Sequence, residues 1–123
     1  METQKEKIVI IDTIGQENPE KATLPFVLAT AAQASDVEVV IFLQSSAVVL
    51  AKKGEAEKIQ APGFLPLHEL INSYIEMGGT LKLCSPCLKE RSIAKEDLIE
   101  GCEIIAAGTI VTESLSAKSV ITY

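Results

Sequence analysis

Two cysteines, Cys84 and Cys87, are separated by a serine and a proline. They follow a short apolar run at residues 81–83 and precede residues 88–91, which favour a helix. A thiol between the end of a strand and the start of a helix meets unpaired main-chain N–H groups, which favour its ionised form. The thiolate is the nucleophile in sulfur chemistry. We therefore predict a reactive site at Cys84, with a thiol pKa below the reference value of about 8.5.

Cys87 lies three residues after Cys84, so a helix would place the two side chains on one face. Cys87 is either a partner that resolves sulfur bound to Cys84 or a thiol buried for packing. Lys89 and Arg91 supply positive charge that can bind an anionic substrate. Lys82 is charged too, but strand alternation can point it to the other face of the sheet.

The other metal-ligating residue types give weaker signals. Cys102 precedes a predicted strand and is interpreted as a core thiol, and a structural zinc site would need four ligands. His68 falls on the polar face of its predicted helix, so we expect a solvated histidine and little support for a Cys–His pair. No nucleotide-binding glycine motif is present, and we expect neither a metal nor a cofactor. An acidic run is interpreted as a solvated face, with partner docking as the alternative, and comprises Glu96, Asp97, Glu100 and Glu103.

The composition suits one domain over residues 1–123 with an aliphatic core, because 47% of the residues are hydrophobic and only 4% are aromatic. The net charge of −6 argues against nucleic acid as a direct partner. No apolar stretch is long enough to span a membrane, and the first seven residues lack an apolar signal core. We therefore expect a cytoplasmic protein, in which a Cys-x-x-Cys pair is reactive or metal-binding rather than a structural disulfide.

Strand-like and helix-like segments alternate along the chain. Strands are predicted at residues 8–11, 37–43, 81–84, 103–106 and 119–122, and helices at 19–34, 47–53, 66–77, from 88 onward and at 109–117, with one helical turn at 95–98. Pro25 either kinks the first helix or moves its regular start to about Thr23. This order predicts a three-layer α/β/α fold around a mostly parallel, five-stranded sheet.

Ligand sites of open parallel sheets lie beyond the carboxyl ends of the strands. The residues at those predicted ends are Asp12, Thr13, Gln44, Ser45, Cys84, Gly108 and Thr109. Cys84 is therefore predicted to lie at the edge of the sheet where proteins of this architecture have their ligand-binding sites.

Three segments, together with the order of elements, resemble the DsrE/DsrF/TusD-like proteins, which share the YchN-like fold. They are Lys52-Lys53-Gly54, Leu83-Cys84-Ser85-Pro86-Cys87 with the following Lys89-Glu90-Arg91, and Asp97-Leu98-Ile99-Glu100-Gly101. The resemblance covers nearly the whole chain. It implies a small cytoplasmic protein that assembles as trimers or hexamers and relays sulfur as a persulfide. It also implies that Cys84, at the end of the third strand, is the relay cysteine.

The leading hypothesis is a sulfur carrier or sulfurtransferase that holds sulfane sulfur on Cys84. Its partners would be sulfur donor and acceptor proteins or small thiosulfonates. Cys87 would attack the persulfide, release sulfide and leave a disulfide. The alternatives are a thiol–disulfide oxidoreductase that uses Cys84 and Cys87, and an oligomeric binding module without turnover.

Overall fold

The structure is a computed structural model that describes residues 5–123. Its centre is a five-stranded sheet in the order β4-β3-β2-β1-β5, and every neighbouring pair is parallel. The strands are β1 (Lys7–Asp12), β2 (Glu38–Leu43), β3 (Thr80–Cys84), β4 (Cys102–Ile105) and β5 (Ser119–Thr122). The predicted α/β class and five-stranded parallel sheet are confirmed.

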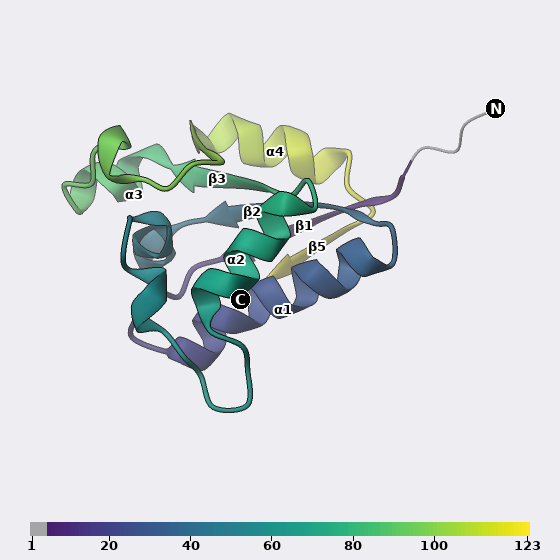
Figure 1. Cartoon of the computed structure of the whole chain (residues 1–123). Coiled ribbons are helices and arrows are strands. Elements are labelled where there is room, and N and C mark those ends of the chain that lie inside the picture. Colours follow the sequence, from purple (N-terminus) through teal and green to yellow (C-terminus); the bar gives the residue numbers. More distant parts are fainter. Residues whose placement is uncertain (1–4) are drawn as a thin grey trace.

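Helices cover both faces of the sheet, and α4 lies opposite α1 and α2 (Figure 1). The α-helices are α1 (Pro19–Ala34), α2 (Leu67–Glu76), α3 (Ser85–Glu90) and α4 (Ala107–Leu115). Short 3₁₀ helices are η1 (Ser45–Ala51), η2 (Ala56–Lys58) and η3 (Lys95–Asp97). The chain moves from β1 to β4 in one direction across the sheet and then returns to β5. Right-handed crossovers therefore place α1 and α2 on one face and α4 on the other.

The main core lies between the sheet and the α1–α2 layer. Alternate residues of β2 point into it, including the fully buried Ile41 and Leu43. Tyr74 of α2 is also fully buried, and its hydroxyl donates to the carbonyl of Thr80 (2.7 Å) and accepts the N–H of Ile41 (3.1 Å). These bonds join α2 to β2 and β3, so they help to fix the strand that ends in Cys84.

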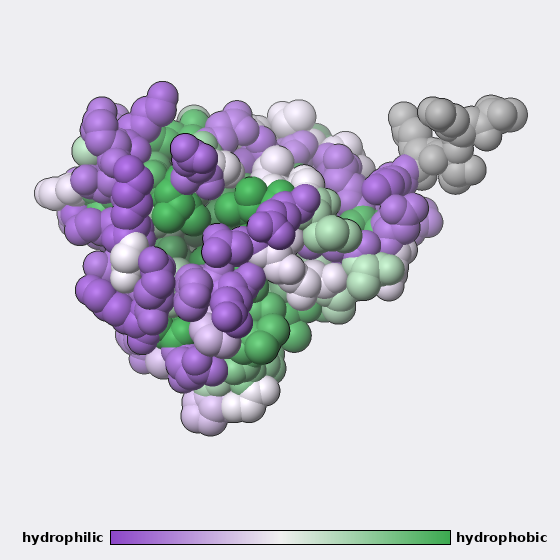
Figure 2. Space-filling view, viewed as in Figure 1, coloured by the Kyte–Doolittle hydropathy of each residue, from purple (hydrophilic) through white to green (hydrophobic). Residues whose placement is uncertain are grey.

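A smaller buried cluster lies on the α4 face and comprises Val9, Val40, Phe42 and Ile105. α4 contributes no fully buried side chain, and its Val111 and Leu115 are 58% and 83% exposed. On the face shown in Figure 2, hydrophobic residues are also visible in a hollow between hydrophilic ones. Within residues 5–123, none of the helices combines the length and apolarity needed to cross a bilayer.

The first helix excludes one of the two alternatives for Pro25, a regular start near Thr23. The side chain of Asn18 accepts the N–H of Lys21 (3.1 Å), and the helix starts at Pro19, where a missing N–H costs no helical bond. It then runs through Pro25 to Ala34 without interruption. The regular helix therefore begins at Pro19 and not near Thr23.

Several predicted boundaries differ from the structure by one to three residues, and the largest of these differences is at α3, which begins at Ser85 rather than residue 88. The segment predicted as a helix at 47–53 is the 3₁₀ helix η1, which begins at Ser45 and has no side-chain cap. β4 begins at Cys102 rather than residue 103, and α4 begins at Ala107 rather than residue 109. These ends depend on where main-chain hydrogen bonding stops, which residue preferences specify weakly.

Candidate functional site: the cysteine pair after the third strand

The two cysteines meet at the carboxyl end of β3. Cys84 is the last residue of the strand, and Cys87 lies in the first turn of α3. Their Sγ atoms are 2.6 Å apart, both thiols are free, and both residues are half-buried. The structure thus brings together the two thiols that the spacing had placed on one helical face.

A third residue, Ser45, completes the immediate surroundings of the pair. Its main-chain N–H donates to Cys87 Sγ at 3.2 Å. β2 and β3 are neighbours with Leu43 opposite Leu83, so the segments after both strands emerge side by side. Ser45 has a φ of 54°, which is rare for a residue with a side chain. Sequence reasoning placed Ser45 on this edge of the sheet but did not find its contact with Cys87.

The loop between β1 and α1 holds the residue next to Ser45. The hydroxyl of Ser46 donates to the carboxylate of Glu17 and accepts the N–H of Gly15 at 3.1 Å. A Cβ atom on Gly15 would collide with the main-chain carbonyl of Ser46, so this approach requires glycine. The start of η1 is therefore fixed from the β1 side of the sheet.

Arg91 lies next to the cysteine pair. Its Nη1 donates to the carbonyl of Cys87 at 3.1 Å. A hydrogen bond from Ser46 lowers the pKa of Glu17, and the charge of Arg91 acts more weakly in the same direction. Arg91 thus lies within electrostatic reach of both the Glu17 carboxylate and Cys84.

The two lysines are placed differently from Arg91. Lys89 is exposed and lies two residues after Cys87, roughly 200° away around the helix. Lys82 forms an ion pair with Glu103 (2.7 Å) and lines a surface pocket with Gly108 and Thr109. Lys82 therefore points to the α4 face of the sheet, the possibility that strand alternation had raised.

The predicted low pKa of Cys84 is wrong. Burial is the largest cause that raises the pKa of this thiol, and the hydrogen bond with Cys87 is the second. The main-chain N–H of Cys87 and the charge of Arg91 act in the opposite direction but are outweighed. The helix behind Cys84 has only six residues, so it offers a small dipole against the loss of solvent.

Asp12, at the carboxyl end of β1, is fully buried. Its Oδ1 accepts the N–H of Ile14 (3.1 Å), and its Oδ2 has no partner. Burial raises the pKa of Asp12 to about 8, and the nearby charge of Glu17 adds to the shift. The sequence had placed Asp12 at a strand end but gave no sign that its carboxyl would be protonated at neutral pH.

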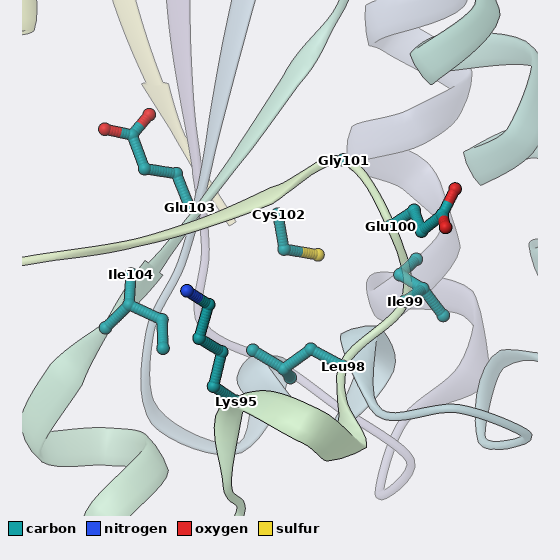
Figure 3. Close-up of a pocket in the computed structure, with 8 residues that line it drawn as sticks. All are labelled: Lys95, Leu98, Ile99, Glu100, Gly101, Cys102, Glu103 and Ile104. Carbon is teal, nitrogen blue, oxygen red and sulfur yellow. The ribbon is translucent and has the colours of Figure 1, made fainter.

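Cys102 lies apart from the pair. Figure 3 shows its thiol pointing from β4 into a cavity of about 630 Å³. The lining residues are Lys95, Leu98, Ile99, Glu100, Gly101, Cys102, Glu103 and Ile104, so neither Cys84 nor Cys87 borders this space. Burial raises the pKa of Cys102 to about 11. The predicted core position is only partly correct, because Cys102 is half-buried against the main core and borders this cavity.

Most residues of the acidic run are solvent-exposed, as predicted. Glu96, Glu100 and Glu103 are exposed, whereas Asp97 is half-buried and accepts the N–H of Ala94 at 2.9 Å. Glu100 and Glu103 also line the cavity around Cys102.

His68 differs from its prediction as a solvated side chain. It is half-buried, and its Nδ1 is buried without a hydrogen-bond partner. It lines a small cavity of about 90 Å³ with Glu57 and Asn72, and neither cysteine of the pair borders that cavity. Over residues 5–123, no three side chains of the metal-binding types converge on one point.

The sequence and the fold of this chain are similar to those of known proteins. The sequence profile of the DsrE/DsrF-like family matches residues 6–123. The chain is 32% identical to the uncharacterised protein MJ0989 of Methanocaldococcus jannaschii over 117 residues, which cover 95% of this chain and 99% of that protein. It is 34% identical to the uncharacterised protein MK0008 of Methanopyrus kandleri, with 96% and 97% covered. Among solved structures, the YchN protein of E. coli superposes with a TM-score of 0.81 at 28% identity, over 96% of this chain and 99% of that one.

Proposed function

Because the chain belongs to the DsrE/DsrF-like family, we propose that it is a sulfur carrier that holds sulfane sulfur on Cys84 and passes it to an acceptor. The observation that best supports this proposal is the pair of free thiols 2.6 Å apart at the carboxyl end of β3. We propose further that residues 1–123 form a single DsrE-like domain that works in the cytoplasm. Its partners are a sulfur donor and an acceptor protein, or a small thiosulfonate.

The first step is attack of Cys84 Sγ, in the singly ionised cysteine pair, on the outer sulfur of the donor. With thiosulfate, a new S–S bond forms at Cys84, the donor's S–S bond breaks, and sulfite leaves with its electron pair. The products are a persulfide anion on Cys84 and sulfite, so the total charge is unchanged. An acceptor thiolate then attacks the outer sulfur of that persulfide, and Cys84 is released as a thiolate.

Cys87 offers the persulfide a second fate. Its sulfur can attack Cys84 Sγ, which breaks the bond to the outer sulfur and forms a Cys84–Cys87 disulfide. The proton of Cys87 leaves with the outer sulfur as hydrosulfide, so sulfane sulfur is reduced while the two cysteines are oxidised. A dithiol reductant then restores the pair.

Arg91 is the residue that we propose for binding an anionic donor. It lies beside the pair, and its guanidinium offers two N–H donors side by side, which can bind two oxygen atoms of such an anion. Lys89, the second cation predicted for this role, lies on another side of α3 and is exposed. Its part in substrate binding stays a prediction that a variant can test.

The proposal is tested by weighing the intact, reduced protein after incubation with thiosulfate or polysulfide. We expect Cys84→Ser to gain no sulfur. We expect Cys87→Ser to gain one sulfur atom and to retain it, because the nearby thiol that would displace it is gone. The wild type should gain sulfur and then proceed to the disulfide with loss of sulfide. Persistent uptake by Cys84→Ser would contradict the assignment to Cys84, and no uptake by any variant would contradict the carrier function.

A thiol–disulfide oxidoreductase is the second candidate, and the short distance between the two free thiols favours it. Such an enzyme would reduce small disulfides through a Cys84–Cys87 disulfide without ever holding extra sulfur. Turnover of a disulfide substrate together with no sulfur uptake from thiosulfate would favour this candidate over the carrier.

We also propose that the chain assembles with copies of itself. α4 buries none of its side chains fully, and Val111 and Leu115 on it are among the exposed hydrophobic residues. An apolar helix face of this kind is commonly covered by a subunit contact. Family resemblance points to a trimer or hexamer. If the chain forms such an assembly but takes up no sulfur, the result would favour the third alternative, an oligomeric binding module without turnover.

A further inference from the structure

The backbone of Ser45 is held in an unfavourable conformation directly beside the cysteine pair. Its φ of 54° lies in the left-handed region, which costs free energy for any residue other than glycine. Such a conformation persists only where the surrounding structure enforces it.

Contacts made by the neighbouring residues hold Ser45 in this conformation. Ser46 is bound to the β1–α1 loop through the carboxylate of Glu17 and the N–H of Gly15. The N–H of Ala47 donates to the carbonyl of Gln44 (3.0 Å), which closes the turn around Ser45. With both sides of Ser45 fixed, its own N–H is directed at Cys87 Sγ, 3.2 Å away.

The two sulfur atoms of the pair therefore have different environments. Cys87 Sγ receives the N–H of Ser45 and lies 2.6 Å from Cys84 Sγ. A hydrogen bond donated to an ionisable group favours its charged form. Cys84 is the last residue of a central strand, where loss of solvent disfavours a charge on its sulfur.

We propose that Ser45 is a positioning residue whose N–H keeps the negative charge of the reduced pair on Cys87, while Cys84 carries the shared proton. In the neutral pair Cys87 Sγ donates to Cys84 Sγ. In the singly ionised pair that we propose, this bond is reversed, so the Cys84 S–H donates to the Cys87 thiolate, which also accepts the Ser45 N–H. Only the main-chain N–H of Ser45 takes part, so its hydroxyl has no role in holding the negative charge on Cys87.

This charge distribution gives Cys87 a role in the first step of the proposed function, and that part of the inference rests on the carrier proposal. As Cys84 Sγ attacks the outer sulfur of thiosulfate, the Cys87 thiolate accepts the proton of Cys84. The donor's S–S bond breaks, and sulfite leaves with the electron pair. The products are a Cys84 persulfide anion, a neutral Cys87 thiol and sulfite, with atoms and charge balanced. Cys87 is then no longer a thiolate, which delays its attack on the persulfide.

The charge assignment is tested on the reduced protein without any sulfur donor, so its outcome is independent of the carrier function. Site-resolved alkylation at neutral pH should modify Cys87 about tenfold faster than Cys84, since the thiolate is the reacting form. The main-chain amide of Ser45 should also shift in nuclear magnetic resonance spectra as pH is raised and the cysteine pair loses its proton. That shift should disappear in Cys87→Ser. Faster alkylation of Cys84 than Cys87 in the wild type would overturn the proposal.

Variants at position 45 separate the N–H from the side chain. Ser45→Gly and Ser45→Ala keep the N–H, and glycine also removes the strain, so both should preserve the preference for Cys87. Ser45→Pro removes the N–H and fixes φ near −65°, so the preference should be lost. Glu17→Gln and Ser46→Ala, which loosen the enforcing contacts without touching the pair, should reduce it partly. An unchanged preference in a folded Ser45→Pro protein would overturn the proposal; if that variant does not fold, the wild-type alkylation order still decides it.

Discussion

Cys84 Sγ and Cys87 Sγ lie 2.6 Å apart across the junction of β3 and α3. At this distance the protonation of one sulfur affects the pKa of the other. The hydrogen bond with Cys87 and the negative charge that Cys87 can carry both raise the pKa of Cys84, in addition to burial. The pair therefore titrates as a unit and not as two independent thiols.

Removing one thiol should make the other easier to ionise. We expect Cys87→Ser to lower the pKa of Cys84 relative to the wild type, because the two raising effects of Cys87 are lost and only burial remains as a major cause. The measurement is the rate of alkylation of Cys84 against pH. Cys102 serves as the internal control, since burial keeps its pKa near 11 in both proteins. An unchanged midpoint for Cys84 would mean that burial alone sets its titration.

Asp12 should make the protein less stable as pH rises. Its folded-state pKa of about 8 lies above its ordinary value of 3.8, so the folded protein binds a proton that the unfolded chain releases. The free energy of unfolding should therefore fall between about pH 4 and pH 8 and level off above that range.

The matched variant for this effect is Asp12→Asn, which keeps an acceptor for the Ile14 N–H but cannot ionise. We expect this variant to lose the fall in the free energy of unfolding between pH 4 and pH 8. At pH 9 its free energy of unfolding should exceed that of the wild type by an amount on the order of a few kcal/mol. Denaturant unfolding at pH 5 and pH 9 gives the comparison. Parallel pH profiles for the two proteins would show that Asp12 is ionised at neutral pH in the folded state.

Arg91 should contribute to reaction with anionic donors more than Lys89 does. Arg91 donates to the carbonyl of Cys87, whereas Lys89 lies on another side of the same helix. We expect Arg91→Ala to slow sulfur uptake from thiosulfate by about two- to tenfold, and to weaken its dependence on ionic strength. Lys89→Ala carries the same change of charge and is the control. Equal slowing by both variants would indicate general attraction by α3 and not a site at Arg91.

The exposed side of α4 should control assembly. We expect the wild type to form trimers or multiples of them at micromolar concentration, and Val111→Glu with Leu115→Glu to dissociate them, because two buried charges per subunit oppose the contact. Light scattering gives the mass. Leu65→Glu changes a hydrophobic side chain of similar exposure, 61%, outside α4 and should leave the assembly intact. A monomeric wild type would remove this proposal.

Much of the fold follows from local patterns in the sequence. The residues that α2 buries, Leu67, Leu70, Ile71 and Tyr74, repeat at helical spacing, and the strands are short apolar runs. Each such signal depends on residues only a few positions apart, so it is readable without knowledge of the rest of the chain. The position of Cys84 at the end of a central strand and its closeness to Cys87 belong to this class.

The chemistry of the site depended on contacts between distant segments. Ser45 is 42 residues from Cys87 in sequence, and only the pairing of β2 with β3 brings its N–H to that sulfur. Burial of Asp12 and the raised pKa of Cys84 likewise arise from side chains and loops that pack over the strand ends. The sequence by itself determined which residues stand at the edge of the sheet. The tertiary structure decided their charge, because the stability of an ion depends on the solvent, donors and charges that folding places around it.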